Sequence, residues 1–328
     1  MFAPAVLLIA MAMLPAVAEA QTGGAPLVLE TKIPLGEVSG RIDHLAIDAK
    51  RQRLFVAELG NNSLGVVDLA AGKVLHRIAG FNEPQGVAYV PFADSIYVAN
   101  AGDGSVRVLR GVDLAPIGRV DLGDDADNVR IDTRHNRVLV GYGKGALAVV
   151  DPASQTKTAD LRLKAHPEGF QIDETGTRVF VNVPDARDIE IVDLAAGSTR
   201  SVPIQGAGSN FPMAIDAAAR RVLVVFRSPP TLMALSSEDG HVVATADTCG
   251  DADDVFVDAK RRRMYVSCGD GFIDVLEPAE TSYRHLARVP TVSGARTSLF
   301  VPELDRLFVA VRAGWREPAA IWVFRPVP

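Results

Sequence analysis

The sequence lacks the short motifs that mark several common enzyme classes. Its 328 residues contain no Gly-x-Ser-x-Gly nucleophile turn, no Walker loop, no His-Glu-x-x-His zinc motif and no Cys-x-x-Cys-His haem attachment site. The Gly-x-Gly segments at 102–104 and 141–143 open no helical pattern and are interpreted as turns. These absences disfavour common nucleotide chemistry, serine hydrolysis and covalent haem chemistry.

A strong excess of one charge is also missing. The chain has 34 Lys and Arg against 40 Asp and Glu, which gives a formal net charge of -6. No run of basic residues is long enough to form a stripe that would bind phosphates. We therefore expect no nucleic-acid partner.

Long apolar runs are absent beyond the N-terminus. Residues 5–14 are apolar and are followed by Ala18-Glu19-Ala20, a small-x-small pattern typical of signal-peptide cleavage. No later stretch reaches the roughly 18 apolar residues that cross a bilayer. We expect residues 1–20 to be a signal peptide cleaved near Ala20, and an exported chain without a membrane span.

A repeat of about 42 residues fills the rest of the chain. Its most regular part begins with an apolar residue followed by Asp, as in Ile47-Asp48. An Arg stands five residues after the Asp and begins a second apolar strand, as in Arg53-Leu54. Seven copies start at positions 48, 91, 132, 173, 216, 258 and 302, which are 41 to 44 residues apart. This is the length of one four-stranded blade. We predict an all-β, seven-bladed propeller of four-stranded antiparallel blades.

The seventh copy is incomplete, because its third strand ends near residue 324. An apolar segment at about 27–35 precedes the first blade, which begins near residue 41. We predict that this segment supplies the missing strand, since its pairing would close the ring and cover exposed sheet edges. The expected organisation is a single propeller domain over residues 21–328.

Two second strands resemble a known repeat signature. Tyr97-Val98-Ala99-Asn100 and Tyr265-Val266-Ser267-Cys268 look like the Tyr-Val-Thr-Asn segment of the bacterial YVTN-repeat β-propeller family. The resemblance covers essentially the whole chain after the apolar N-terminal segment. It implies an exported seven-bladed propeller in the periplasm or outside the cell, and it implies no particular activity.

The repeated Asp and Arg residues have a structural interpretation and a functional one. They would form an ionic binding surface if they were functional. In the structural interpretation the Asp caps its own turn while the Arg packs or pairs across it. We favour the second, because a feature repeated around a ring is more simply explained by the blade than by one ligand.

Residues that break the repeat therefore carry the functional hypothesis. The innermost strand of each blade starts beside the central channel, so the residues at these starts should form a ring around one mouth. The predicted ligand-binding ring is Asp43, Gln85, Asp127, Glu168, Phe211, Asp253 and Arg296, with His44, Asn128 and His166 as immediate neighbours. A small molecule or a protein partner is expected at this face.

Several carboxylates around one channel repel each other, which a hard cation would relieve. The candidate ligands for Ca²⁺ or another divalent cation are Asp127, Asn128, Glu168 and Asp253. The alternative, which we favour, is a hydrated channel in which Arg130 and Arg296 supply the counter-charge, because no contiguous calcium loop is present. No cofactor is certain from the sequence.

Catalysis at this mouth would depend on histidine and a carboxylate. His44 follows Asp43 and His166 lies near Glu168, so His44, His166 and Glu168 are the candidate catalytic residues. Adjacent residues of a strand point to opposite sides, so sequence neighbours need not touch.

The only two cysteines, Cys249 and Cys268, flank the start of the sixth blade. An exported chain with two cysteines favours a disulfide. Two separate thiols or a redox-active pair are the alternatives.

The sequence favours a binding or scaffold propeller as the function. The main alternative is a metal-dependent hydrolase resembling propeller lactonases, in which a channel cation polarises a carbonyl group. A third alternative is an accessory protein to a periplasmic redox enzyme, which no residue motif supports.

Overall fold

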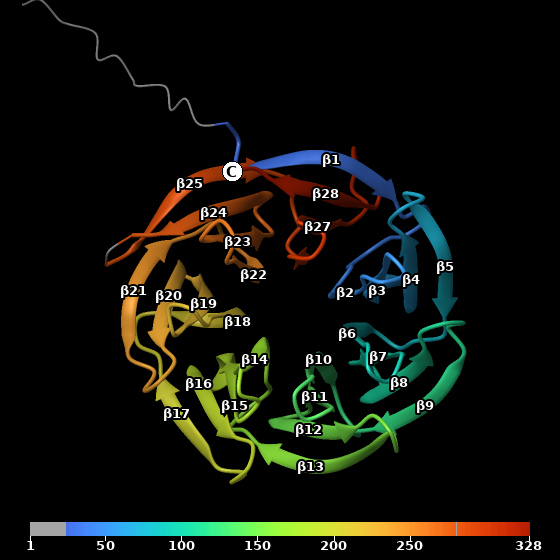
Figure 1. Cartoon of the computed structure of the whole chain (residues 1–328), viewed down its shortest axis with the longest axis horizontal. Helices are drawn as coiled ribbons and strands as arrows, with labels where there is room; N and C mark the ends of the chain where they lie inside the picture. Colours follow the sequence, from blue (N-terminus) through green and yellow to red (C-terminus); the bar gives the residue numbers. More distant parts are fainter. Residues whose placement is uncertain (1–23, 280) are drawn as a thin grey trace, which may run out of the picture.

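The alternation of apolar strands and polar turns produces seven separate four-stranded sheets. The computed structural model describes residues 24–279 and 281–328. Every sheet is antiparallel, and the seven are arranged in a ring (Figure 1). The predicted seven-bladed propeller is confirmed. The predicted signal peptide, residues 1–20, lies outside the described residues.

The first four blades follow one another in sequence. Blade 1 consists of β2 (Leu45–Asp48), β3 (Arg53–Glu58), β4 (Ser63–Asp68) and β5 (Lys73–Ala79). Blade 2 consists of β6 (Pro84–Val90), β7 (Ser95–Asn100), β8 (Ser105–Arg110) and β9 (Pro116–Asp121). Blade 3 consists of β10 (Ala126–Asp132), β11 (Arg137–Tyr142), β12 (Ala146–Asp151) and β13 (Thr156–Arg162). Blade 4 consists of β14 (Phe170–Ile172), β15 (Arg178–Val183), β16 (Asp188–Asp193) and β17 (Thr199–Pro203).

The last three blades include the one that joins both ends of the chain. Blade 5 consists of β18 (Gly208–Asp216), β19 (Arg221–Ser228), β20 (Pro230–Ser236) and β21 (Val242–Asp247). Blade 6 consists of β22 (Ala252–Asp258), β23 (Arg263–Cys268), β24 (Phe272–Pro278) and β25 (Tyr283–Pro290). Blade 7 consists of β26 (Ser298–Val301), β27 (Arg306–Val311), β28 (Ala320–Pro326) and β1 (Leu27–Pro34).

Helix is confined to two single 3₁₀ turns among the described residues. They are η1 (Leu59–Asn61) and η2 (Pro184–Ala186), and each follows the second strand of its blade. No helix in residues 24–279 and 281–328 has the length and apolar character needed to cross a membrane.

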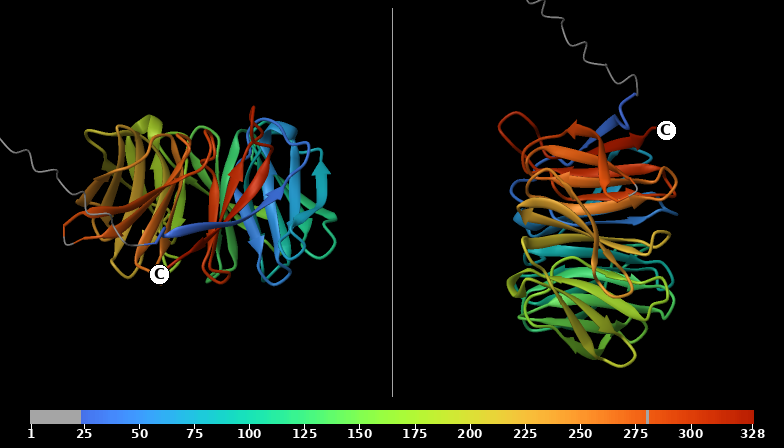
Figure 2. Two further views of the ribbon diagram at one scale, coloured as in Figure 1. Left: turned by 90° about the horizontal axis from the view of Figure 1, so that it is seen from above. Right: turned by 90° about the vertical axis from the view of Figure 1, so that its left-hand side faces the viewer.

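The ring closes through a strand from the opposite end of the chain. β1 runs antiparallel to β28, with Leu27 opposite Pro326 and Pro34 opposite Ala320. Figure 2 shows β1 along the outer rim of the ring. The predicted closing strand is confirmed, and its pairing covers the outer edge of β28.

The repeated turn residues join each blade to the next. In five blades the turn Asp accepts backbone N–H groups of its own turn, as Asp48 does from the Arg51 N–H at 3.1 Å. The Arg five residues later reaches the following blade in all five, for example Arg137, which donates to the Gly176 carbonyl at 2.8 Å. Arg137 and Arg178 also pair with the Asp of their own turn. The pair therefore caps a turn and links neighbouring blades.

Apolar side chains fill the space between facing sheets. Between blades 2 and 3, Tyr97 and Val108 meet Val138 and Val150, and all four are fully buried. Similar clusters lie between other neighbouring blades. Face-to-face packing of this kind fixes the sheets relative to one another, which leaves the loops at the ends of the ring free to differ.

The closing strand offers a matched test of ring closure. Leu27 and Leu29 both belong to β1, but Leu27 is 2% exposed and Leu29 is 39% exposed. We expect Leu27→Ala to lower the free energy of unfolding by about 2–4 kcal/mol because it leaves a cavity between blades 6 and 7. Leu29→Ala should cost less than about 1 kcal/mol. Equal losses in chemical denaturation would contradict the role given to β1.

Candidate functional site

The innermost strands are irregular at the channel mouth. The pairing between first and second strands shifts register between Pro84 and Val87 in blade 2, and between Ala126 and Val129 in blade 3. Blades 5 and 6 shift at the equivalent places. A β-bulge bends the strand and re-aims a side chain. The ring residues Gln85, Asp127, Phe211 and Asp253 lie inside these irregular segments.

These strands surround a cavity of about 510 Å³ that runs along the channel. Residues from all seven blades line it, and at the mouth these are His44, Asn128, Glu168, Phe211 and Asp253. Asp43 and Asp127 are buried beside them. The backbone carbonyl of Gln85 accepts a hydrogen bond from the backbone N–H of His44 at 3.3 Å. The predicted ring residues thus lie around one mouth.

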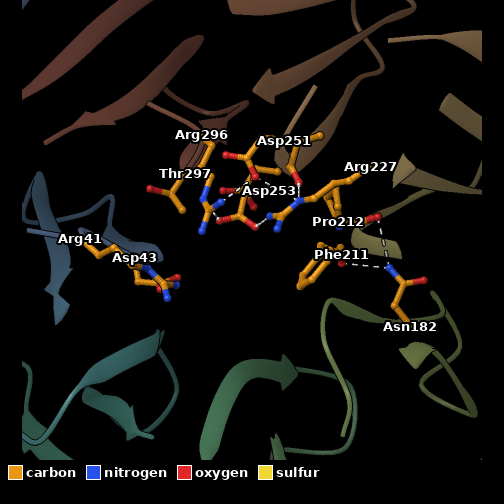
Figure 3. Close-up of polar contacts among 12 residues, drawn as sticks. Arg41, Asp43, Asn182, Phe211, Pro212, Arg227, Asp251, Asp253, Arg296 and Thr297 are labelled. Carbon is orange, nitrogen blue, oxygen red and sulfur yellow. Dashed lines mark hydrogen bonds and ion pairs between the residues drawn. The ribbon is translucent and has the colours of Figure 1, made fainter. Parts of the chain in front are cut away.

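Asp253 is held in a four-residue ion-pair network on one side of the mouth. Arg227 pairs with Asp253 and lies 3.4 Å from Asp251, while Arg296 contacts Asp253 at 3.0 Å and Asp251 at 2.7 Å. Figure 3 shows both guanidinium groups turned toward the two carboxylates. Arg227 also lies over the ring of Phe211, with 3.8 Å between the guanidinium carbon and the ring centroid. Arg296 therefore supplies counter-charge, as the sequence suggested, and Arg227 joins it.

Phe211 is positioned by the neighbouring blade. The side-chain amide of Asn182, from β15, donates to the carbonyl oxygens of Phe211 at 2.9 Å and Pro212 at 3.2 Å (Figure 3). These bonds hold the irregular segment of β18 against blade 4. The aromatic face under Arg227 is consequently fixed before any ligand arrives.

Asp43 and His44 lie on the other side of the channel. Arg41 donates to Asp43 at 2.6 Å, but 3.7 Å separates His44 Nε2 from Asp43 Oδ1, which is too long for a hydrogen bond. Burial raises the pKa of Asp43. Burial alone would lower the pKa of His44, but the carboxylates of Asp43 and Asp254 outweigh it, so that pKa is raised.

Asp127, His166 and Glu168 form the second cluster of the mouth. One donor atom from each lies within 4.8 Å of the others. Burial, followed by the charge of Asp127, raises the pKa of Glu168 to about 8. Burial opposes protonation of His166, but Asp127 and the Gly143 carbonyl raise its pKa to about 9. These two candidate catalytic residues therefore share one site, whereas His44 stands apart from it.

Asp254 is buried in the channel wall beside Asp253. Its carboxylate accepts the backbone N–H of Ser298 at 2.7 Å. Burial raises the pKa of Asp254 to about 7, and His44 and Arg130 partly offset that effect. Arg130 also donates to the Val129 carbonyl at 2.9 Å.

Sequence reasoning missed Arg41 and Asp125 as contributors to the mouth. Arg41 binds Asp43, and Asp125 lies 3.7 Å from His166. Both stand two residues before a ring position. In five blades this position has a positive φ, namely at Glu83, Asp125, Ser209, Asp251 and Gly294. Counting back two residues from each ring position would have found them.

The two cysteines form a disulfide next to this mouth. Cys249 and Cys268 are buried, and their Cα atoms are 5.9 Å apart. The backbone N–H of Cys249 also donates to the buried carboxylate of Asp274 at 2.6 Å. The bond ties the segment before β22, which carries Asp251, to the end of β23.

Comparisons with solved structures agree with the propeller fold. A hydrazine synthase chain of Kuenenia stuttgartiensis matches with a TM-score of 0.73 and 17% identity, over 84% of this chain and 94% of that one. The RRP9 WD40 repeats match with a TM-score of 0.77 and 10% identity, over 90% and 97%. A chain of the mitotic checkpoint complex matches with a TM-score of 0.73 and 13% identity, over 94% and 99%. At such identities the likeness concerns the fold alone.

No protein-family model matches the sequence, and the search of curated proteins gave no match either. The site must therefore be judged from its own geometry.

The disulfide is expected to stabilise the mouth segment. Cys249 and Cys268 are 19 residues apart, and a loop of that size corresponds to about 3 kcal/mol in the chain-entropy model. Replacing both with Ala should lower the free energy of unfolding by about 2–4 kcal/mol. Chemical denaturation of the native protein and of the double Cys→Ala variant, both without reductant, measures this difference. An unchanged midpoint would contradict a stabilising role.

Asp254 should make stability depend on pH. Its folded pKa of about 7 exceeds the unfolded value, so the stabilising contribution is complete below about pH 4 and is lost as the pH rises through 7. Asp254→Asn should therefore gain stability relative to the native protein between pH 5 and 8, by on the order of 2–4 kcal/mol. Asp216→Asn, at the half-buried end of β18, is the control. Parallel pH profiles for the native protein and Asp254→Asn would contradict this account.

Proposed function

We propose that this protein is a binding propeller that presents its channel mouth to a small molecule or to a segment of a protein partner. One observation carries the proposal, namely that charged, amide and aromatic side chains from different blades converge on a cavity of about 510 Å³. Small-molecule sites commonly have volumes of about 300–1,000 Å³ and a few convergent polar groups. A rigid ring with one specialised face suits this role.

The chemistry of the mouth favours a polar ligand. The carboxylates of Asp251 and Asp253 hold Arg227 and Arg296 side by side. The aromatic ring of Phe211 lies under the Arg227 guanidinium group. The first strand of each blade has a sheet neighbour on one side only, so unpaired backbone groups also face the channel. A ligand with both donors and acceptors would find partners for each.

The finer proposal is an exported bacterial protein of the YVTN-repeat type, located in the periplasm or secreted. The N-terminal apolar segment with Ala18-Glu19-Ala20 supports export, and a disulfide is typical of an oxidising compartment. The signature tyrosines Tyr97 and Tyr265 occupy matching, fully buried positions on second strands. Nothing in the charge pattern favours nucleic acid as a partner.

A second candidate function is metal-assisted hydrolysis of a lactone or ester. The grouping of Asp127, His166 and Glu168 is the observation that favours it. A cation held there would polarise the carbonyl group, and His44 would be the base because it stands outside the group. Hydrolysis of a lactone panel by metal-supplemented protein, lost in His44→Asn, would support this function over simple binding.

Photo-crosslinking tests the binding proposal directly. A benzophenone amino acid placed at Phe211 probes the mouth, and the same amino acid at Phe92 is a matched control. Phe92 is an exposed phenylalanine in the turn after β6, on the opposite face. Cells expressing each variant should yield a discrete, saturable adduct from position 211 and none from position 92. Equal labelling at both positions, or none at 211, would contradict the proposal.

A further inference from the structure

We propose that Asp127, His166 and Glu168 form a binding site for a divalent transition-metal ion such as Zn²⁺, with an open coordination position toward the channel. The site lies at the same mouth as the proposed ligand site, but it does not depend on that function. It also differs from the acidic set suggested by the sequence, because it includes an imidazole nitrogen and leaves Asp253 out.

The separations of the donor atoms suit a shared ion. One atom from each of the three residues lies within 4.8 Å of the others. His166 Nε2 and Asp127 Oδ2 are 3.8 Å apart, which is too long for a hydrogen bond. Two ligands that each lie about 2.0–2.2 Å from a tetrahedral ion are separated by roughly 3.3–3.6 Å. A contraction of a few tenths of an ångström would bring both to ligand distance.

The orientation of His166 supports the same assignment. Its Nδ1 lies 2.6 Å from the Gly143 carbonyl oxygen, which can only accept a hydrogen bond. Nδ1 therefore carries the proton in the neutral ring, which leaves the lone pair on Nε2, the nitrogen that lies 3.8 Å from Asp127 Oδ2. Histidines that bind metals commonly hold their second ring nitrogen against a carbonyl or carboxylate in this way, which fixes the tautomer and the ring orientation.

Asn128 provides an independent sign that a ligand is expected here. Its side chain is 2% exposed and lines the channel cavity, yet its Oδ1 has no hydrogen-bond partner within the part of the chain that is described. The Nδ2 of the same amide lies 3.4 Å from Asp127 Oδ1. A buried, unpaired amide oxygen is costly unless something binds it. A metal ion, or a water molecule bound to it, would satisfy this oxygen.

The surroundings also indicate which kind of ion would bind. Asp253 is occupied by Arg227 and Arg296, so the site lacks the six to eight oxygen ligands that Ca²⁺ prefers. One imidazole and two carboxylates instead suit Zn²⁺ or Co²⁺. Three protein ligands leave a fourth position for water or for a ligand in the channel.

Titration of chelator-treated protein with CoCl₂ and ZnCl₂ tests the site. We expect one equivalent of Co²⁺ to bind and to give the visible absorption bands of a four- or five-coordinate ion, which Zn²⁺ should then displace. His166→Ala and Glu168→Gln should each weaken binding at least 100-fold. CaCl₂ should produce no saturable heat at the same concentrations.

His135→Ala is the matched control. His135 also contacts a buried aspartate, Asp132 at 2.9 Å, but on the opposite face of the ring. This variant should bind Co²⁺ like the native protein. Absence of saturable binding, or binding that survives both His166→Ala and Glu168→Gln, would overturn the proposal. Thermal unfolding without metal verifies that each variant is folded, and either of the two site variants suffices if the other fails to fold.

Failure of this proposal can be distinguished from failure of the binding function. The crosslink at position 211 requires no metal, so it should persist in chelator-treated cells and in His166→Ala. Absence of saturable metal binding by the native protein, with retention of the crosslink, would overturn only the metal site.

Discussion

The pairing of β1 with β28 is the interaction on which the whole arrangement depends. A blade can bury its faces only when another blade stands on each side, so an open ring would expose two complete sheet faces. The closing strand supplies the last sheet with its fourth member and ties the two ends of the chain together. With the circle closed, the first strands of seven blades are held at fixed positions around one channel. The convergence of distant residues at the mouth follows from that closure.

Much of the scaffold could be predicted because its determinants are local. The turn from Asp48 to Arg53 and its copies depend on residues a few positions apart, so their spacing gave the number of blades and the closing strand. The partners of the repeated Arg were harder to foresee. Arg53 and Arg263 reach backbone carbonyls of the next blade, and that contact depends on how two sheets pack.

The mouth was predictable as a set of positions but not as a set of contacts. Counting from the turn placed Asp127, Glu168 and Asp253 around one opening. Counting could not show that these carboxylates have different partners. Asp253 pairs with Arg227 and Arg296, whereas Asp127 lies near His166. That division depends on how the bulged inner strands of blades 3 and 6 face the neighbouring blades. It gives the mouth two chemically different sides, one an ion-pair network over an aromatic ring and the other a histidine grouped with two carboxylates.

Residues at which blades depart from the repeat form a binding site at the mouth, and its metal-binding side is Asp127, His166 and Glu168. Diffraction at the zinc absorption edge tests this most directly. Crystals of the protein soaked in low concentrations of ZnCl₂ should give one strong anomalous peak, about 2.0–2.2 Å from Asp127, His166 and Glu168. That result would establish the open side of the mouth as a site with defined ligands. Zinc found only at surface carboxylates and histidines such as His241, with no peak at the mouth, would contradict the account.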